Sequence, residues 1–354
     1  MKKTLLAVAI PSLLVANMAS AAEIYKSDEG SVDFYGQLRT ELKKSEDKEV
    51  TLNAGSSRAG VSAQYTLAEG VDVFGKVEFG LQGKGDYVMK NRLHIAGVAT
   101  DFGKFSFGRQ WVVSDEVWGA DYSYFFGGTG LRHATLSGAR HDSLIKYNYD
   151  GENFWVAANY GLDQDDSNQE LAELYAGTSV AGFNLHLGGG QNTAKKFKVG
   201  TDDVTDPNKP KDITADLRNT YIEGTAEYSF GAALVGFTYY NAKLEDLNSS
   251  KQIKENAYSL AGTYAFTDKA TAYTGFEYVE QKPSGGVNEE KGDGKNFYLG
   301  AVYKFNSWAR IYGEYGYAKG TTTGFTNKGS DSFVGPTSVK DGESNFAIGA
   351  RVYW

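Results

Sequence analysis

The sequence predicts an all-β fold, a transmembrane antiparallel β-barrel of about sixteen strands with one segment folded into its interior. Three observations predict it. Apolar and polar residues alternate with a period of two along much of the chain, short turns alternate with long polar segments, and the N-terminus has the pattern of an export signal. Period-two alternation gives a strand one apolar and one polar face. Turns that are short on one side of the sheet and long on the other are typical of bacterial transmembrane barrels.

The N-terminal segment is predicted to be a cleaved signal peptide. Two lysines precede an apolar run at residues 5–16, and Ala19-Ser20-Ala21 supplies the small-x-small pattern that signal peptidase cuts. The apolar run is too short to cross a bilayer as a helix, which takes about 20 residues. No later stretch is apolar over that length, which excludes a helical membrane protein. We therefore expect residues 1–21 to be removed and residues 22–354 to form one barrel domain.

Composition narrows the classes of function. Without the signal peptide the chain has 34 basic and 44 acidic side chains, a net charge of −10, which argues against a nucleic-acid partner. The chain has no cysteine, so it cannot form a disulfide framework or a thiolate metal site. We expect no cofactor and no metal ion.

The first predicted strand shows the alternation most clearly. Its apolar face has Val32, Phe34, Gly36, Leu38, Thr40 and Leu42, and its polar face has Asp33, Tyr35, Gln37, Arg39, Glu41 and Lys43. The pattern recurs at Leu93, Ile95 and Gly97, and in further segments up to Trp354. We therefore expect Leu93 and Ile95 on the apolar face, and charged residues in a wet interior.

The predicted connections alternate in length. Short turns fall at residues 100–103, 150–153, 267–269 and 306–307. Long polar segments, expected to be loops that face the cell exterior, fall at residues 191–217, 245–255, 281–294 and 319–342. A soluble β-sandwich is the alternative fold, but it would have to bury charged strand faces such as the one with Arg39 and Glu41. The barrel is therefore favoured.

One segment interrupts this rhythm, from Arg109 to Ala139. It is rich in aromatic and acidic residues, so we expect it to fold back into the lumen and narrow it; an outside loop in contact with another subunit is the alternative. Its acids Asp115, Glu116 and Asp121 would face lumen cations, and the resulting transverse field would select small hydrophilic solutes. The lumen cations are Arg39, Arg58, Lys90, Arg92 and Arg140. The plainer interpretation is that these cations only solvate a polar wall.

An enzymatic function has little support. His141 and Asp142 are the only adjacent histidine and acid, but neighbours along a strand point to opposite faces and cannot act as a dyad. No nucleophile elbow, phosphate-binding glycine loop or zinc spacing is present. We expect the protein not to be an enzyme, and an outer-membrane hydrolase remains the least favoured hypothesis.

Several stretches resemble the general diffusion porins of the OmpF, OmpC and PhoE type from Gram-negative outer membranes, and the resemblance covers essentially the whole mature chain. They are residues 22–25, 32–36, 91–97 and 102–109. The inward segment then reads Phe125-Phe126-Gly127-Gly128 where the family usually has Pro-Glu-Phe-Gly-Gly, so that Phe125 occupies the glutamate position. The chain ends in Trp354, where the family normally has Phe.

The resemblance implies a homotrimer of sixteen-stranded barrels in the outer membrane, in contact with lipid and lipopolysaccharide. It places the basic wall on Arg58, Lys90, Arg92 and Arg140, with Gln37 in place of a lysine and Arg39 two residues further along the same face. It also matches the family's aspartate to Asp121. The segment from Gly83 to Met89 is shorter than the family's latch to the neighbouring subunit, and Asp86 is its candidate acid. Trimer contacts would then depend mainly on Phe34, Leu38, Phe346 and Ile348.

The expected function is passive diffusion of ions and small hydrophilic solutes, with a mild preference for cations that follows from the acidic net charge. A substrate-selective porin is the alternative, in which lumen tyrosines such as Tyr298 and Tyr312 bind a solute such as a sugar.

Overall fold

The computed structural model describes most of the chain. The described residues are 21–46, 48–81, 89–129, 136, 139–163, 169–202, 211–286, 289–325 and 333–354. They form eighteen strands and one short helix. Among them, no helix is both long enough and apolar enough to cross a membrane. The expected signal peptide falls almost wholly outside the described residues, as does most of the segment with Asp86.

Sixteen of these strands form the barrel wall. The first eight are β2 (Gly30–Ser45), β4 (Arg58–Ala68), β5 (Val71–Gly80), β6 (Lys90–Thr100), β7 (Gly103–Trp111), β8 (Arg140–Asp150), β9 (Phe154–Gly161) and β10 (Gln169–Val180). The others are β11 (Phe183–Asp202), β12 (Lys211–Phe230), β13 (Ala233–Asp246), β14 (Gln252–Ala265), β15 (Ala270–Ser284), β16 (Gly292–Asn306), β17 (Ala309–Phe325) and β18 (Phe333–Tyr353). Each pairs antiparallel with its neighbours.

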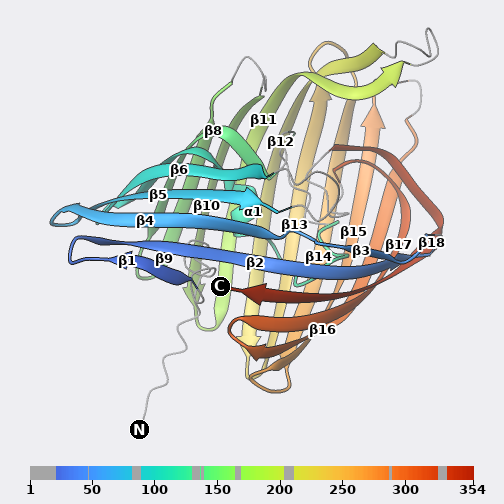
Figure 1. The fold of residues 1–354 in the computed structure, drawn as a ribbon. Helices are drawn as coiled ribbons and strands as arrows, with labels where there is room; N and C mark the ends of the chain where they lie inside the picture. The colour runs from blue at the N-terminus through green and yellow to red at the C-terminus, as the bar shows by residue number, and fades with distance from the viewer. Residues whose placement is uncertain are drawn as a thin grey trace.

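The barrel closes where β18 pairs with β2 (Figure 1). Two short strands lengthen the edges that meet there. β1 (Ala22–Lys26) pairs with the start of β2 and so continues the line of β18, while β3 (Thr51–Asn53) pairs with the end of β2 and continues the line of β4. The backbone groups of Trp354 and Gly36 exchange two hydrogen bonds at this seam. The prediction of a sixteen-stranded barrel is confirmed.

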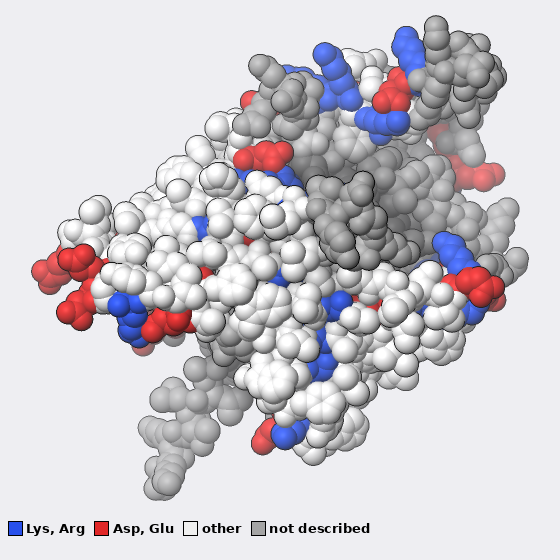
Figure 2. All heavy atoms as spheres, viewed as in Figure 1, with Lys and Arg blue, Asp and Glu red and all other residues white. Residues whose placement is uncertain are grey.

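Side chains alternate between the two faces as expected. On β2, Leu38 and Leu42 are exposed on the outer face, whereas Gln37 and Glu41 are buried on the inner face, at 3% and 4% exposure. In Figure 2 the charged side chains gather mainly toward the ends of the visible strands, and the wall between them is mostly uncharged. An apolar outer band with a polar interior is the arrangement of a barrel that lies in lipid.

The expected orientation of Leu93 and Ile95 was wrong. Both are buried, at 3% and 8% exposure, on the inner face, and it is His94 that points outward. The cause is a β-bulge, because Phe79 pairs with Asn91 and its neighbour Glu78 pairs with Leu93, which leaves Arg92 without a direct partner. One extra residue in a strand reverses the inward and outward parity of everything after it.

The long polar segments are mostly strands rather than open loops. β11 and β12 have 20 residues each, and their ladder runs on to the pair Asp202 and Lys211, so most of residues 191–217 is paired sheet. A tilted strand needs only about 9–11 residues to cross a membrane. These strands therefore extend beyond the apolar band, which explains their polar sequence. Strands β4 to β9 have only 8–11 residues, so this part of the wall does not extend beyond the apolar band as β11 and β12 do.

Candidate constriction site

The segment between β7 and β8 folds into the barrel, as the sequence predicted. It begins with a single helical turn, α1 (Val113–Val117), whose first N–H groups have no partner within the helix. Glu173 on β10 accepts hydrogen bonds from Val113 N at 2.8 Å, from Ser114 N at 3.3 Å and from Ser114 Oγ at 2.7 Å. A carboxylate at a helix N-terminus is favoured by the helix dipole. A wall residue thus acts as the cap that the segment itself lacks.

A second attachment lies at Ala120, in the middle of the segment. Its backbone N–H donates to Thr238 Oγ1 at 2.7 Å, and its carbonyl oxygen accepts from Ser259 Oγ at 2.6 Å. The next attachment is at Tyr122, whose N–H donates to the Tyr298 hydroxyl at 3.1 Å. Both backbone groups of the buried Ala120 are therefore paired with side chains of the wall.

Two further carboxylates hold the tip of the segment. Glu314 on β17 accepts from Tyr124 N and Phe126 N, both at 2.6 Å. Glu277 on β15 accepts from Gly128 N at 2.7 Å, and also from Thr129 N at 2.9 Å. Hydrogen bonds to a charged acceptor are stronger than neutral ones. Carboxylates on three wall strands, β10, β15 and β17, therefore hold the segment in addition to the attachments at Ala120 and Tyr122.

An open cavity of about 720 Å³ lies between this segment and the wall from β2 to β8. The sequence-predicted residues around it are Arg39, Arg58, Lys90, Arg92, Arg140, Asp121 and Phe125. Asp115 and Glu116 are not among its lining residues, and Glu116 instead forms an ion pair with Lys146 at 2.7 Å. The structure thus brings seven of the nine candidates together and places two acids elsewhere.

The basic side of the cavity is internally ordered. Glu78 forms ion pairs with Arg92, at 2.8 Å between Oε1 and Nε, and with Arg58, at 3.6 Å between Oε2 and Nε. The guanidinium of Arg140 lies 4.3 Å from the Trp111 ring centre, and that of Arg92 lies 5.5 Å from it. Stacking on an aromatic face fixes the plane of a guanidinium and leaves its N–H edge accessible. Trp111 therefore orients two of the cations.

The other side of the cavity is aromatic rather than acidic. Asp121 is buried, and its carboxylate accepts hydrogen bonds from the N–H and the hydroxyl of Ser123, at 2.9 and 3.1 Å. The Phe125 ring packs 5.3 Å from the Tyr312 ring, and Lys43 Nζ lies 5.0 Å from its centre. Counting only described lining residues, seven are basic and two, Glu41 and Asp121, are acidic.

The residues behind the other two functional hypotheses are not arranged for those roles. His141 is buried with Nδ1 accepting from Ser143 N, whereas Asp142 is exposed and pairs with Arg109. Tyr298 and Tyr312 are buried, at 0% and 2% exposure, under the inward segment. Neither pair presents reactive or binding groups to a solute.

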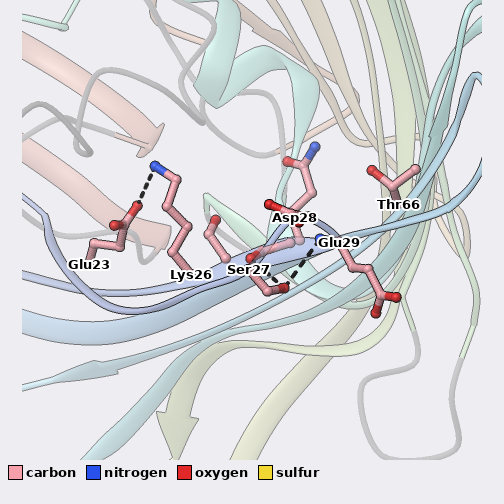
Figure 3. A pocket seen from close by; sticks show the side chains of 9 residues that line it. Glu23, Lys26, Ser27, Asp28, Glu29 and Thr66 are labelled. Carbon is pink, nitrogen blue, oxygen red and sulfur yellow. Dashed lines mark hydrogen bonds and ion pairs between the residues drawn. The ribbon is translucent and has the colours of Figure 1, made fainter.

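A second pocket, of about 340 Å³, lies at the turn between β1 and β2 (Figure 3). Lys26 Nζ lies 3.1 Å from Glu23 Oε2, and Ser27 Oγ accepts the N–H of Glu29. Its charged side chains are largely exposed to solvent, as is usual at a turn.

A family profile described as Gram-negative porin matches residues 4–323. This chain belongs to the Gram-negative porin family. The porin resembles the solved structure of "OmpT (in-vitro folded), an outer membrane protein of Vibrio cholerae", with a TM-score of 0.86 and 55% identity over 94% of this chain and 100% of that one. It is 26% identical to the major outer membrane protein of Pasteurella multocida (strain Pm70), over 91% of this chain and 96% of the relative. It is 29% identical to porin-like protein H of Photobacterium profundum, over 89% of this chain and 94% of the relative.

Family and fold together give the porin its place and its general activity. It is a β-barrel of the Gram-negative outer membrane and a diffusion channel across that membrane. The charge and shape of the cavity then bear on which solutes pass.

Proposed function

We propose that the channel passes ions and small hydrophilic solutes passively, without enzymatic chemistry, and that its constriction is the cavity between the inward segment and the β2–β8 wall. Arg39, Arg58, Lys90, Arg92 and Arg140 would form its basic side, with Asp121 and Phe125 opposite. The attachment of the inward segment to the wall carries the proposal, because a fixed segment keeps the opening at one size. Asp115 and Glu116 would act in positioning that segment rather than in the opening itself.

For ion preference, we propose that the constriction favours anions. The mild cation preference was expected from the net charge of the whole mature chain and stays a prediction. The anion preference proposed here comes from the residues that line the cavity. Charges more than about 10 Å from an ion are largely screened at 0.1 M salt, so the lining residues act most strongly. These include seven basic side chains and two acidic ones, Glu41 and Asp121. Glu78 offsets part of the charge of Arg58 and Arg92, and Asp142 offsets that of Arg109, so seven basic side chains face four acids.

The test is a single-channel recording of the purified protein in a planar bilayer under a potassium chloride gradient. The expected reversal potential has the sign for chloride, and Arg92→Ala moves it toward the potassium value. A potassium-directed reversal potential in the parent protein would refute the anion preference. If no substitution of a basic lining residue changes the reversal potential from that of the parent protein, the proposed position of the constriction is refuted as well.

We also propose that three copies assemble in lipid that contains lipopolysaccharide. One support is a matching structure whose title gives Vibrio cholerae OmpT in "trimer form", at a TM-score of 0.85. Another is that Phe34, Leu38, Phe346 and Ile348 are exposed on adjacent strands β2 and β18, where an apolar face suits a neighbour or lipid. Current that closes in three equal steps is the expected result, and a single step would contradict the proposed trimer.

A further inference from the structure

Four cations form a row across the inner wall. Arg39 on β2 pairs in register with Arg351 on β18, Arg351 pairs with Arg310 on β17, and Arg310 pairs with Lys304 on β16. Their neighbours Leu38, Ile311 and Val352 are exposed on the outer face, so the row lies on the lumen face. Residues directly opposite each other on adjacent strands have Cβ atoms about 4.5–5.5 Å apart. Of these four cations, only Arg39 was predicted from the sequence as a site residue.

The three arginines in this row form no close ion pair with a described carboxylate. Within the part of the chain that the structure describes, no ion pair joins Arg39, Arg310 or Arg351 to an acid within 4.0 Å. Glu41, two residues along β2, pairs instead with Lys43 at 3.3 Å. The Nε atoms of Arg39 and Arg310 are buried without a hydrogen-bond partner. Like charges directly opposite on a sheet are destabilising, and no close ion pair with a described acid offsets that cost for these three arginines.

Aromatic rings hold the row in place. The Arg351 guanidinium lies 4.8 Å from the ring centres of both Tyr124 and Tyr312, and the Arg310 guanidinium lies 4.9 Å from that of Tyr353. Arg351 Nε also donates to the Tyr312 hydroxyl at 3.0 Å. A ring stabilises the face of a guanidinium but cannot satisfy its in-plane N–H groups. A guanidinium held rigid in this way can offer its terminal N–H groups to carboxylate or phosphate in a forked, bidentate contact.

The row also has a direction. Arg39 lines the constriction cavity, whereas Lys304 is exposed beside the short turn between β16 and β17. Short turns of outer-membrane barrels face the periplasm. The row thus leads from the constriction toward the periplasmic mouth, about one strand spacing of 4.7–4.9 Å at a time.

We propose that Arg351 and Arg310, together with Arg39 at the edge of the constriction, form a second anion-binding site that extends from the constriction toward the short-turn end and takes polyvalent oxyanions such as phosphate or small organic polycarboxylates. This inference rests on the proposed function in one respect, because it requires that ions pass through the constriction cavity. It adds a site at which an anion stays, whereas the constriction sets which ions enter. Chloride, which is monovalent and spherical, gains little from a forked donor, so binding should discriminate by valence and shape.

The experiment measures chloride current while inorganic phosphate replaces chloride at constant ionic strength on one side at a time. The parent protein should show a saturable fall in current that begins at lower phosphate concentration from the short-turn side. The double variant Arg310→Gln/Arg351→Gln should raise the half-blocking phosphate concentration at least about tenfold, which equals 1.4 kcal/mol. Lys269→Gln, which removes a cation from the β14–β15 turn on the same rim, is the matched control and should leave the block unchanged.

Two further variants separate this site from the constriction. Arg351→Lys keeps the charge but loses the fork, so it should raise the half-blocking phosphate concentration. Arg92→Gln should move the reversal potential and leave the phosphate block. If phosphate does not block the parent, or blocks the double variant equally well, the second site is refuted. If Arg92→Gln alone abolishes the block, the anion binds at the constriction, which refutes the second site and leaves the proposed function standing. Should the double variant fail to fold as a heat-modifiable barrel, Arg310→Gln alone decides by the same criterion.

Discussion

The carboxylate of Glu314 accepts the backbone N–H of Tyr124 at 2.6 Å, across 190 positions of sequence. It joins the wall of the barrel to the tip of the segment that narrows it. Through this bond and the one from Phe126, a single side chain sets the height at which the Tyr124 and Phe125 rings stand in the lumen. The size of the opening therefore depends on the wall as much as on the segment.

Replacement of Glu314 by Gln should loosen the tip, because an amide offers one neutral oxygen to N–H groups that now share a charged carboxylate. Loss of hydrogen bonds at buried groups costs about 1–3 kcal/mol. We expect a lower thermal unfolding temperature and added noise in the open-channel current. Glu29→Gln, in the exposed turn before β2, is the control and should change neither quantity. A quiet channel of parental stability in Glu314→Gln would show that the other attachments suffice.

Truncation of Phe125 to Ala should widen the opening. Phe125 lines the cavity and packs on Tyr312, and no charge is removed with its ring. Single-channel conductance should therefore rise while the reversal potential stays the same, and Phe125→Leu should give an intermediate conductance. An unchanged conductance would mean that another part of the lumen limits the current.

Arg140→Ala should move the reversal potential toward cations. Arg140 is stacked on Trp111 at the cavity, so its removal lowers the positive charge where ions pass. Trp111→Leu should have a smaller effect of the same sign, since it frees the Arg140 guanidinium without removing it. Equal effects of the two substitutions would indicate that the orientation of Arg140, rather than its charge, controls selectivity.

The closing seam predicts a difference between two glycines. A Cβ on Gly36 would overlap the Trp354 ring, whereas a Cβ on Gly75 would have only Ile95 O within 4 Å, at 3.6 Å. Overpacking costs about 1–3 kcal/mol. Gly36→Ala should therefore lower the unfolding temperature and Gly75→Ala should not, as measured by loss of β-sheet circular dichroism on heating. Equal stability would mean that Trp354 can move aside.

The alternation of residue types predicted the barrel and its closure, because the two faces of a strand meet different solvents. The inward segment was predicted because it interrupts that alternation and is rich in aromatic and acidic residues. Local defects were not predictable in this way. The bulge at Arg92 reverses parity without any glycine or proline to signal it, so Leu93 and Ile95 were assigned to the wrong face.

The candidate site was predictable where it depends on strand parity, as for Arg39 and Arg58. It was not predictable where it depends on contacts between distant segments. Glu116 was predicted to face the channel. Its ion-pair partner Lys146 lies on β8, far from it in the sequence, so no local pattern indicates the pair. Glu173 was not predicted as a site residue, since a cap for α1 supplied from β10 leaves no local pattern in the sequence. Arg351 and Arg310 lie on the polar face of their strands, as Arg39 does, so the alternation of residue types could have identified them as lumen residues.

The seam between β2 and β18 makes this chain finish its fold with its last residues. Arg39 and Arg351 are register partners from opposite ends of the sequence, so the ring of strands cannot close before both have been delivered to the membrane. Until then the sheet has two unpaired edges, which attract other strands and promote aggregation. Contacts between such distant residues also slow folding, because loop closure must come first. For this chain, therefore, the two edges stay exposed until β2 and β18 meet.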